Sequence, residues 1–256
     1  MSAAVGDAFV EFEDVHKAFG DKKVLDGITF EIRRGETMVV LGGSGSGKSV
    51  LIRHIIGLHR PDRGHVIVDG DDIVDYDEEE LIPVRKKVAM LFQGGALFDS
   101  MNVLDNIAYG LREHTDMADE AIREVVRRKL ALVGLEDVEE LMPSELSGGM
   151  KKRVALARSI AMDPQCILYD EPTTGLDPVT ATTINELIRN LQRGLQVTSV
   201  VVTHDIASAF FVGDRIAYLF EGHMHFVGTV EEARTAREPR LRHFLSGGRE
   251  GSVATL

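Results

Sequence analysis

Residues 42–49 read Gly42-Gly43-Ser44-Gly45-Ser46-Gly47-Lys48-Ser49. This order of residues matches G-x-x-x-x-G-K-[ST], the loop that binds phosphate between a strand and a helix. Apolar residues fill positions 38–41 and predict a buried strand, while the apolar residues from Val50 onward predict a helix. A flexible Gly/Ser linker rarely lies between two such segments. The stretch therefore predicts an α/β fold with a site for a nucleoside triphosphate.

The residue types in this loop suit a chain of phosphates. Glycines let backbone N–H groups turn toward a phosphate without interference from a Cβ atom. The helix that follows adds the partial positive charge of its first turn. The ammonium of Lys48 can reach the β- and γ-phosphates, and the hydroxyl of Ser49 can bind Mg²⁺.

Composition limits the class of protein. The chain has 256 residues, of which 44% are hydrophobic, so we expect one large domain with a sizeable core. Its formal net charge of −12 argues against a nucleic-acid partner and against electrostatic docking on anionic lipid. The single cysteine, Cys166, permits no intrachain disulfide and suits a reducing cytosol. No stretch approaches about 18 apolar residues, and no secretory signal is expected at residues 1–7. If the protein works at a membrane, another chain must hold it there.

Apolar patterns predict the order of the elements. Strands are predicted at residues 9–15, 24–32, 64–70, 88–92, 166–169 and 197–202. Residues 98–162 are helical in character, with an apolar stripe of Ala118, Ala121, Ile122, Val125, Val126, Leu130 and Val133. A helix at residues 180–191 between two strands favours a parallel sheet covered by helices. A hairpin is expected around Glu221-Gly222, the acidic residues 69–80 should form a solvated surface, and residues from Ser246 onward should be frayed.

A pair of acids forms the second candidate site. The apolar residues from Cys166 to Tyr169 end in Asp170 and Glu171, at the carboxyl edge of a predicted buried strand. Open α/β sheets bind their ligands at that edge. Asp170 suits a residue that holds Mg²⁺, and Glu171 suits a general base that orients and polarises an attacking water. Acids also end strands for structural reasons alone, but the upstream phosphate loop favours the catalytic interpretation.

The third motif reads Leu146-Ser147-Gly148-Gly149-Met150, followed by Lys151-Lys152-Arg153. It resembles the signature motif of ABC-transporter ATPases. Physically it is a second anion-binding helix start, where Ser147 and the amides of Gly148 and Gly149 can face a γ-phosphate. The resemblance implies that this surface completes the nucleotide site of a second copy, with two ATP molecules between two chains. The alternative is a Ser-Gly-Gly loop that only caps a helix.

The remaining positions of that family follow in the expected order. Phe19 resembles the aromatic residue that stacks on adenine, and its alternative is a core phenylalanine. Gln93 resembles the Q-loop glutamine, which implies that it senses Mg²⁺ and the attacking water. The segment from Thr174 to Asp177 resembles the D-loop of the dimer interface, and His204 resembles the switch histidine near the γ-phosphate.

The resemblance implies a P-loop NTPase fold of ABC type. Its parts are a RecA-like core with a parallel sheet, an N-terminal antiparallel β subdomain and a helical subdomain that carries the signature. We expect a single domain over residues 1–256, with the core at about 9–97 and 163–245, the helical insert at about 98–162 and a tail at 246–256. Lys48, Gln93, Glu171 and His204 are then the expected catalytic residues of ATP hydrolysis.

The residues after Gln93 narrow the subfamily. Residues 92–100 read F-Q-G-G-A-L-F-D-S, and residues 106–114 read N-I-A-Y-G-L-R-E-H. These patterns, the Thr173-Thr174 pair and Met150 are similar to the ATPases of Mla/Mce-type lipid transporters. The resemblance implies an integral membrane permease that docks between Gln93 and Met101, a periplasmic Mce-type lipid-binding protein and a small cytoplasmic regulatory subunit. It places the chain on the cytoplasmic face of the inner membrane, bound through the permease.

The resemblance implies that ATP hydrolysis by this chain powers the transport of lipid, expected to be phospholipid, between bacterial membranes through that permease. Two other functions compete with this one. One is the ATPase of another ABC transporter, for amino acids or an organic solute. The other is a soluble ABC-type protein of translation or DNA repair. Such proteins usually carry two cassettes or a long coiled-coil insert, and this acidic chain shows neither.

Overall fold

The computed structural model describes residues 7–247. Contacts divide the chain into two compact units. The first unit contains the chain up to Arg85 and again from Thr198, and the second contains Lys86–Val197. The predicted subdomain boundaries stay predictions.

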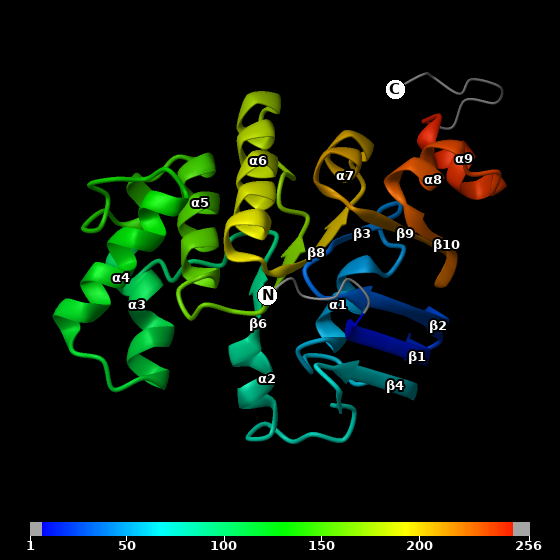
Figure 1. Ribbon diagram of the computed structural model, residues 1–256, viewed down its shortest axis with the longest axis horizontal. Helices are drawn as coiled ribbons and strands as arrows, with labels where there is room; N and C mark the ends of the chain where they lie inside the picture. The colour runs from blue at the N-terminus through cyan, green and yellow to red at the C-terminus, as the bar shows by residue number, and fades with distance from the viewer. Residues whose placement is uncertain (1–6, 248–256) are drawn as a thin grey trace. The chain divides into compact units, whose positions relative to one another are not determined.

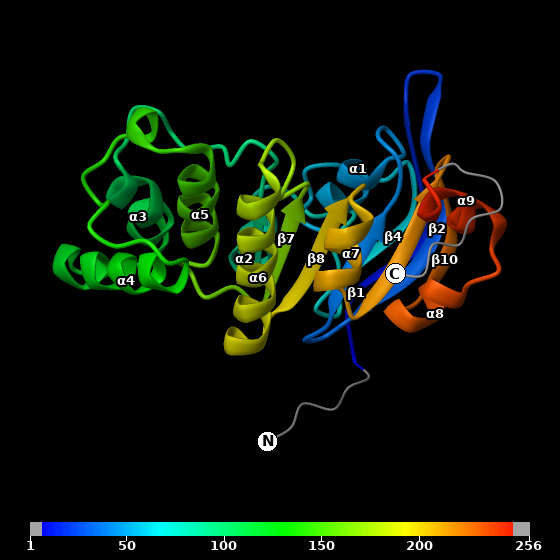
Figure 2. The ribbon, with the colours of Figure 1, turned by 90° about the horizontal axis from the view of Figure 1, so that it is seen from above.

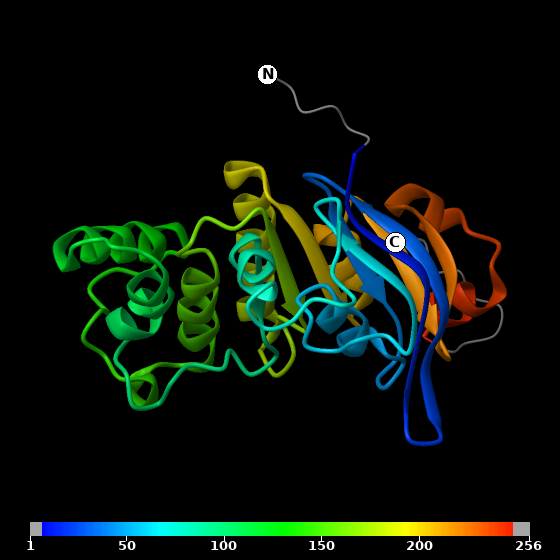
Figure 3. The ribbon, with the colours of Figure 1, turned by 90° about the horizontal axis from the view of Figure 1, so that it is seen from below.

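An antiparallel sheet forms one layer of the first unit. Its strands lie in the order β2 (Lys22–Arg33), β1 (Ala8–Phe19), β4 (Arg63–Val68) and β5 (Asp71–Asp72). Val10, Phe12 and Val15 on β1 are buried, and the rings of Phe12 and Phe30 stack at 5.0 Å between centroids. β1 is longer than the predicted strand at 9–15, because its hairpin with β2 continues to Phe19 (Figure 3).

The other sheet strands of the first unit carry the phosphate loop. β3 (Thr37–Leu41) lies between β8 (Thr198–Thr203) and β9 (Arg215–Phe220) and is parallel to both. β10 (His223–Thr229) pairs with β9 through the predicted hairpin at Glu221-Gly222 (Figure 1). Both faces of β3 are covered, so every residue of this strand is buried.

Short helices accompany these strands. α1 (Lys48–His54) packs against β8, and α7 (Ile206–Val212) packs against β3 and β8. α8 (Val230–Thr235) and α9 (Pro239–Leu245) follow β10. The predicted tail lies almost wholly outside the described residues, since only 246 and 247 follow α9 there.

The second unit combines two parallel strands with helices. β6 (Val88–Leu91) pairs with β7 (Cys166–Asp170), and Leu91 lies beside Tyr169. α2 (Leu81–Lys87), which begins in the first unit, leads into β6. Figure 2 shows α3 (Val103–His114), α4 (Asp119–Leu132) and α5 (Gly148–Ser159) together, with a 3₁₀ turn at Pro143–Glu145 before α5. α6 (Pro178–Leu195) packs on α5.

Most of the predicted elements are confirmed. Ile122, Val125, Val126 and Leu130 of the predicted apolar stripe are buried and fix α4 against α3 and α5. Helices α2, α7, α8 and α9 were not predicted, since six or seven residues give no clear helical period. Among the helices of residues 7–247, none is both long and apolar enough to cross a bilayer.

Candidate functional site

The phosphate loop in the first unit depends on two glycines. A Cβ atom on Gly42 would lie 2.3 Å from the carbonyl oxygen of Leu219, and one on Gly47 would lie 2.8 Å from that of Val24. Gly47 also has a φ of 103°, in the left-handed region that disfavours side chains. The loop therefore passes so close to the strands behind it that only glycine fits at these two positions.

The exposed side of this loop fits a phosphate chain. A Cβ atom added to Gly43 or Gly45 would meet no atom of residues 7–247 within 4 Å, so there is space beside the backbone at both positions. The hydroxyl of Ser46, by contrast, is buried on the packed side of the loop near Gly42, and it has no hydrogen-bond partner in the described part of the chain. The ammonium of buried Lys48 donates to the carbonyl oxygens of Gly42 and Gly43, at 2.8 and 2.9 Å. Lys48 thus lies along the loop, where its charge would meet a bound phosphate.

His204 lies at the edge of the sheet where the phosphate loop begins. β3 and β8 are parallel, and Leu41 pairs with Thr203 at their carboxyl ends. Gly42 and His204 are the next residue of each strand, so the structure brings the predicted switch histidine beside the start of the phosphate loop. Asp205 then caps α7 by accepting a hydrogen bond from the amide of Ala207 at 3.0 Å.

Phe19 is an exposed aromatic residue at the end of β1. Its side chain is 46% exposed, so the core alternative is wrong. The ring of His59 meets it edge-on at 5.4 Å between centroids, and the Lys17 ammonium lies 5.5 Å from its centroid. An exposed ring held by neighbours is suited to stacking on a base.

The second unit holds the two acids at the carboxyl end of β7. Asp170 and Glu171 are both buried. Glu171 has a φ of 48°, an unfavourable conformation for a residue with a Cβ atom, which is typical of constrained functional positions. The Thr174 hydroxyl donates to its carboxylate at 3.1 Å. Gln93 follows β6, the neighbouring strand, so the structure brings Gln93 and the two acids to one edge of the β6–β7 pair.

The signature segment starts α5. Ser147 caps this helix, and its hydroxyl accepts a hydrogen bond from the amide of Met150 at 3.3 Å. A Cβ atom on Gly149 would lie 2.7 Å from the Thr180 side chain, so this glycine is needed for close packing of α5 on α6, whatever it binds. The same position on Gly148 is open. Asp177 caps α6 and accepts from the amide of Thr180 at 3.0 Å.

Two basic residues of α5 hold the segment after β6. Lys152 is buried and donates to the Gln93 carbonyl, and Arg158 donates to the carbonyls of Gly95 and Ala96 at 2.9 and 2.8 Å. Burial lowers the pKa of Lys152, while the negative charge of Asp170 acts in the opposite direction. The sequence showed Lys152 only as part of a basic run. Its position four residues before buried Leu156 was the signal that it lies on the inner face of the helix.

The surface predicted to receive a membrane partner is partly apolar. Phe98 is 44% exposed, and its ring contacts that of exposed Tyr109 at 5.2 Å between centroids. Ala96 is exposed, whereas Leu97 and Met101 are partly buried. The guanidinium of Arg158 lies 5.7 Å from the centroid of Phe98 and fixes the ring on one side.

Comparison with known proteins identifies the family. The "ABC transporter" family matches residues 25–174. The chain is 45% identical over 244 residues to the "Probable ribonucleotide transport ATP-binding protein mkl" of Mycobacterium tuberculosis H37Rv, covering 95% of this chain and 68% of that protein. It is 41% identical over 244 residues to the "Intermembrane phospholipid transport system ATP-binding protein MlaF" of Escherichia coli K12, covering 95% of this chain and 91% of that protein.

Solved structures show the same fold. A dimeric post-hydrolysis state of the ATP-binding cassette MJ0796, bound to ADP and Pi, matches with a TM-score of 0.80 and 34% identity. The match covers 86% of this chain and 98% of that one. CbiO1 of Clostridium perfringens, part of the ABC transporter complex cbiONQ, matches with a TM-score of 0.82 and 31% identity over 91% of this chain and 92% of that one.

Proposed function

The chain belongs to the ABC transporter family and is an ATPase of that family, and from this premise we propose that its ATP hydrolysis drives phospholipid transport between membranes through a separate permease. The observation that supports phospholipid as the substrate is the 41% identity to the E. coli phospholipid transport ATPase over 95% of the chain. That match spans 91% of the relative, so nearly the whole of both chains corresponds.

Ribonucleotide transport is a second candidate, because the M. tuberculosis relative with that name is 45% identical. The match covers 68% of the length of that relative. The match to the phospholipid relative covers 91% of that protein.

The residues of the two units have separate proposed roles in hydrolysis. Lys48 and the amides of the phosphate loop bind the β- and γ-phosphates, and the open faces of Gly43 and Gly45 support this role. Glu171 orients and polarises the attacking water as the general base, assisted by Gln93 and His204. Mg²⁺ would neutralise charge on the phosphates. The hydroxyl of Ser49 in the first unit and the carboxylate of Asp170 in the second each offer an oxygen atom of the kind that this ion prefers.

The signature segment is proposed to act on ATP held by a second copy of the chain. Two observations support this: the chain has one phosphate loop and one signature, and a dimeric cassette is among its structural relatives. Mixing Lys48→Ala chains with Ser147→Arg chains tests it, since half of the mixed dimers' sites would be intact. Recovery of ATPase activity supports action in trans. The control is a heterodimer of a wild-type chain and a Lys48→Ala chain, purified through a different affinity tag on each chain so that wild-type dimers are absent and one intact site remains. Activity in this heterodimer, but none in the equally purified Lys48→Ala/Ser147→Arg heterodimer, contradicts the proposal.

The permease is proposed to dock on Phe98 and its neighbours between Gln93 and Met101, which would hold this chain at the cytoplasmic face of the inner membrane. Support comes from the exposed Phe98–Tyr109 pair. The Phe98→Ser variant should lose the permease on co-purification while keeping its own ATPase activity. The matched control is Phe211→Ser, which changes a phenylalanine of similar exposure, 41%, in the first unit. A periplasmic Mce-type protein and a small cytoplasmic subunit should co-purify with the same complex.

Transport by the purified complex decides the substrate. The complex is reconstituted in vesicles, and ATP-dependent transfer of a labelled phospholipid to acceptor vesicles is compared with movement of a labelled ribonucleotide. We expect phospholipid transfer that is lost in the Glu171→Gln complex. Ribonucleotide movement without phospholipid transfer would replace the proposed substrate.

A further inference from the structure

Among residues 7–247, the end of β1 that carries Phe19 has a neighbouring strand on one side only. β1 pairs with β4 only as far as His16, which lies beside Arg63. Beyond that point Lys17, Ala18 and Phe19 pair with β2, and with no other strand in the described part of the chain. A ladder that is open on one side leaves backbone groups without partners and lets a hairpin end move.

Asp62 forms hydrogen bonds with the end of β1, beyond the last residue that β1 pairs with β4. Its amide donates to the carbonyl oxygen of His16 at 2.8 Å, and its carboxylate accepts from the amide of Ala18 at 2.7 Å. The same carboxylate accepts from the ammonium of Lys17 at 2.8 Å. One residue therefore binds three consecutive residues of β1 directly before Phe19. The hydrogen bond from Lys17, followed by that from Ala18, holds the pKa of Asp62 below its ordinary value, so the carboxylate is charged at neutral pH.

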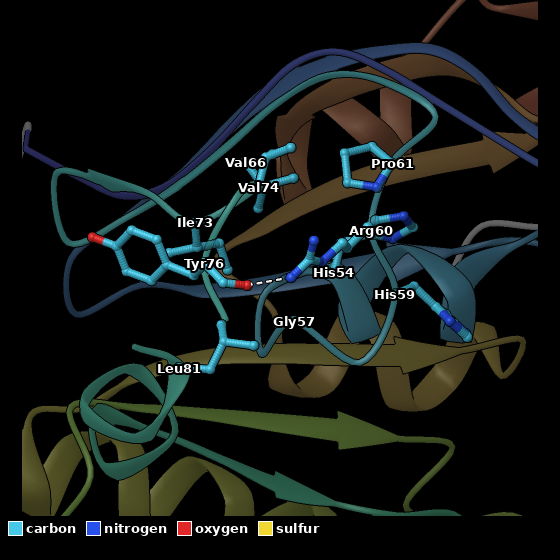
Figure 4. Close-up of a pocket in the computed structure, with 10 residues that line it drawn as sticks. All are labelled: His54, Gly57, His59, Arg60, Pro61, Val66, Ile73, Val74, Tyr76 and Leu81. Carbon is cyan, nitrogen blue, oxygen red and sulfur yellow. Dashed lines mark hydrogen bonds between the residues drawn. The ribbon is translucent and has the colours of Figure 1, made fainter. Parts of the chain in front are cut away.

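The same loop also holds the ring of Phe19. His59, three residues before Asp62, meets that ring edge-on at 5.4 Å between centroids. The loop follows α1 directly, and the amide of Leu58 donates to the Arg53 carbonyl at 2.9 Å. Figure 4 shows His54, His59, Arg60 and Pro61 along this segment, around a cavity of about 10 Å³, which is room for roughly one water molecule. A compact loop thus connects the helix of the phosphate site to the residues that fix Phe19.

We propose that Asp62 is a positioning residue for the nucleotide base: it holds the end of β1 so that the exposed ring of Phe19 is fixed for stacking on adenine. The inference rests on the proposed binding of ATP and adds a residue that touches neither phosphate nor base. Holding a ring in its binding orientation lowers the entropic cost of binding, so loss of Asp62 weakens the base contact and leaves phosphate binding unchanged.

The experiment compares a ligand that has a base with one that lacks it. Dissociation constants of ADP and of inorganic pyrophosphate, each with Mg²⁺, are measured by titration calorimetry on the full chain. Neither ligand is hydrolysed at the γ-position, so turnover does not interfere. The variants are Asp62→Ala, Phe19→Ala and the double variant. Asp21→Ala is the matched control, because it removes the same charge from the exposed turn next to Phe19.

Phe19→Ala should weaken ADP about tenfold, as expected for loss of one base–aromatic stack. Asp62→Ala should weaken the binding of ADP about fivefold and leave the affinity for pyrophosphate unchanged. In the Phe19→Ala background it should cause no further loss of ADP affinity. Asp21→Ala should bind both ligands like the wild type.

Three results overturn the role of Asp62: unchanged ADP affinity, an equal loss for both ligands, or losses that multiply in the double variant. Two other results would refute the proposed function and not the role of Asp62 alone. If the wild-type chain binds neither ligand, the proposed phosphate site is wrong. If the Phe19→Ala chain binds ADP with wild-type affinity, the proposed contact between Phe19 and the base is wrong.

Discussion

Replacing His54 with leucine should make the protein more resistant to mild acid. The side chain of His54 is 1% exposed, and its Nδ1 lies 2.8 Å from the Val50 carbonyl, to which it donates. Its Nε2 is buried and has no hydrogen-bond partner among the described residues. Burial is the main cause that lowers the pKa of His54 from 6.5 to about 4. The folded protein therefore keeps this imidazole neutral at a pH where the unfolded chain protonates it.

The sign and size of the effect follow from proton linkage. Between the unfolded pKa of 6.5 and the folded pKa of about 4, the unfolded state binds more protons, so stability is lost as the pH falls. The two pKa values imply a loss of about 2 kcal/mol at a pH of about 5, and almost none at a pH of about 7.5. Leucine carries no proton and removes this contribution.

The contribution of His54 is measured by urea unfolding at both pH values. Unfolding is followed by far-UV circular dichroism, because the chain has no tryptophan to serve as a fluorescent probe. The drop in unfolding free energy between the two pH values should be about 2 kcal/mol smaller for His54→Leu than for the wild type. His243→Leu on α9 replaces an exposed histidine and should behave like the wild type. If His54→Leu loses as much stability in acid as the wild type, His54 is not held neutral by burial.

Three further substitutions test the site. Gly42→Ala places a Cβ atom 2.3 Å from the Leu219 carbonyl oxygen. The unfolding free energy measured in urea should fall by about 2 kcal/mol, and ADP affinity should fall as well. An unchanged unfolding free energy would contradict the close approach of the loop to Leu219. Lys152→Met removes the donor to the Gln93 carbonyl and should lower kcat about tenfold with ADP affinity unchanged, and a normal kcat would show that this contact does not position the loop. Glu171→Gln should keep ATP binding, lower kcat by at least about 100-fold and retain the ATP-bound dimer on size exclusion; turnover at the wild-type rate would exclude Glu171 as the base.

Much of the site could be read from short stretches of sequence. The phosphate loop, the Asp170-Glu171 pair and the signature are each set by neighbouring residues, and their strand or helix context is local as well. The exposure of Phe19 was not readable, because an aromatic residue at a strand end occurs both in cores and on surfaces. Nor was the contact of Lys152, whose partner lies 59 positions away.

The sequence by itself determined the chemistry and its order along the chain, because phosphate loops, strand-end acids and helix caps depend on residue types at fixed short spacing. Tertiary structure decided which of these groups became neighbours. The pairing of β3 with β8 sets His204 beside Gly42, and the contact of Asp62 with Ala18 fixes the end of β1 across 44 positions. Such contacts form because burying apolar faces of distant segments outweighs the entropy of closing the chain between them, and no local pattern records which segments will meet.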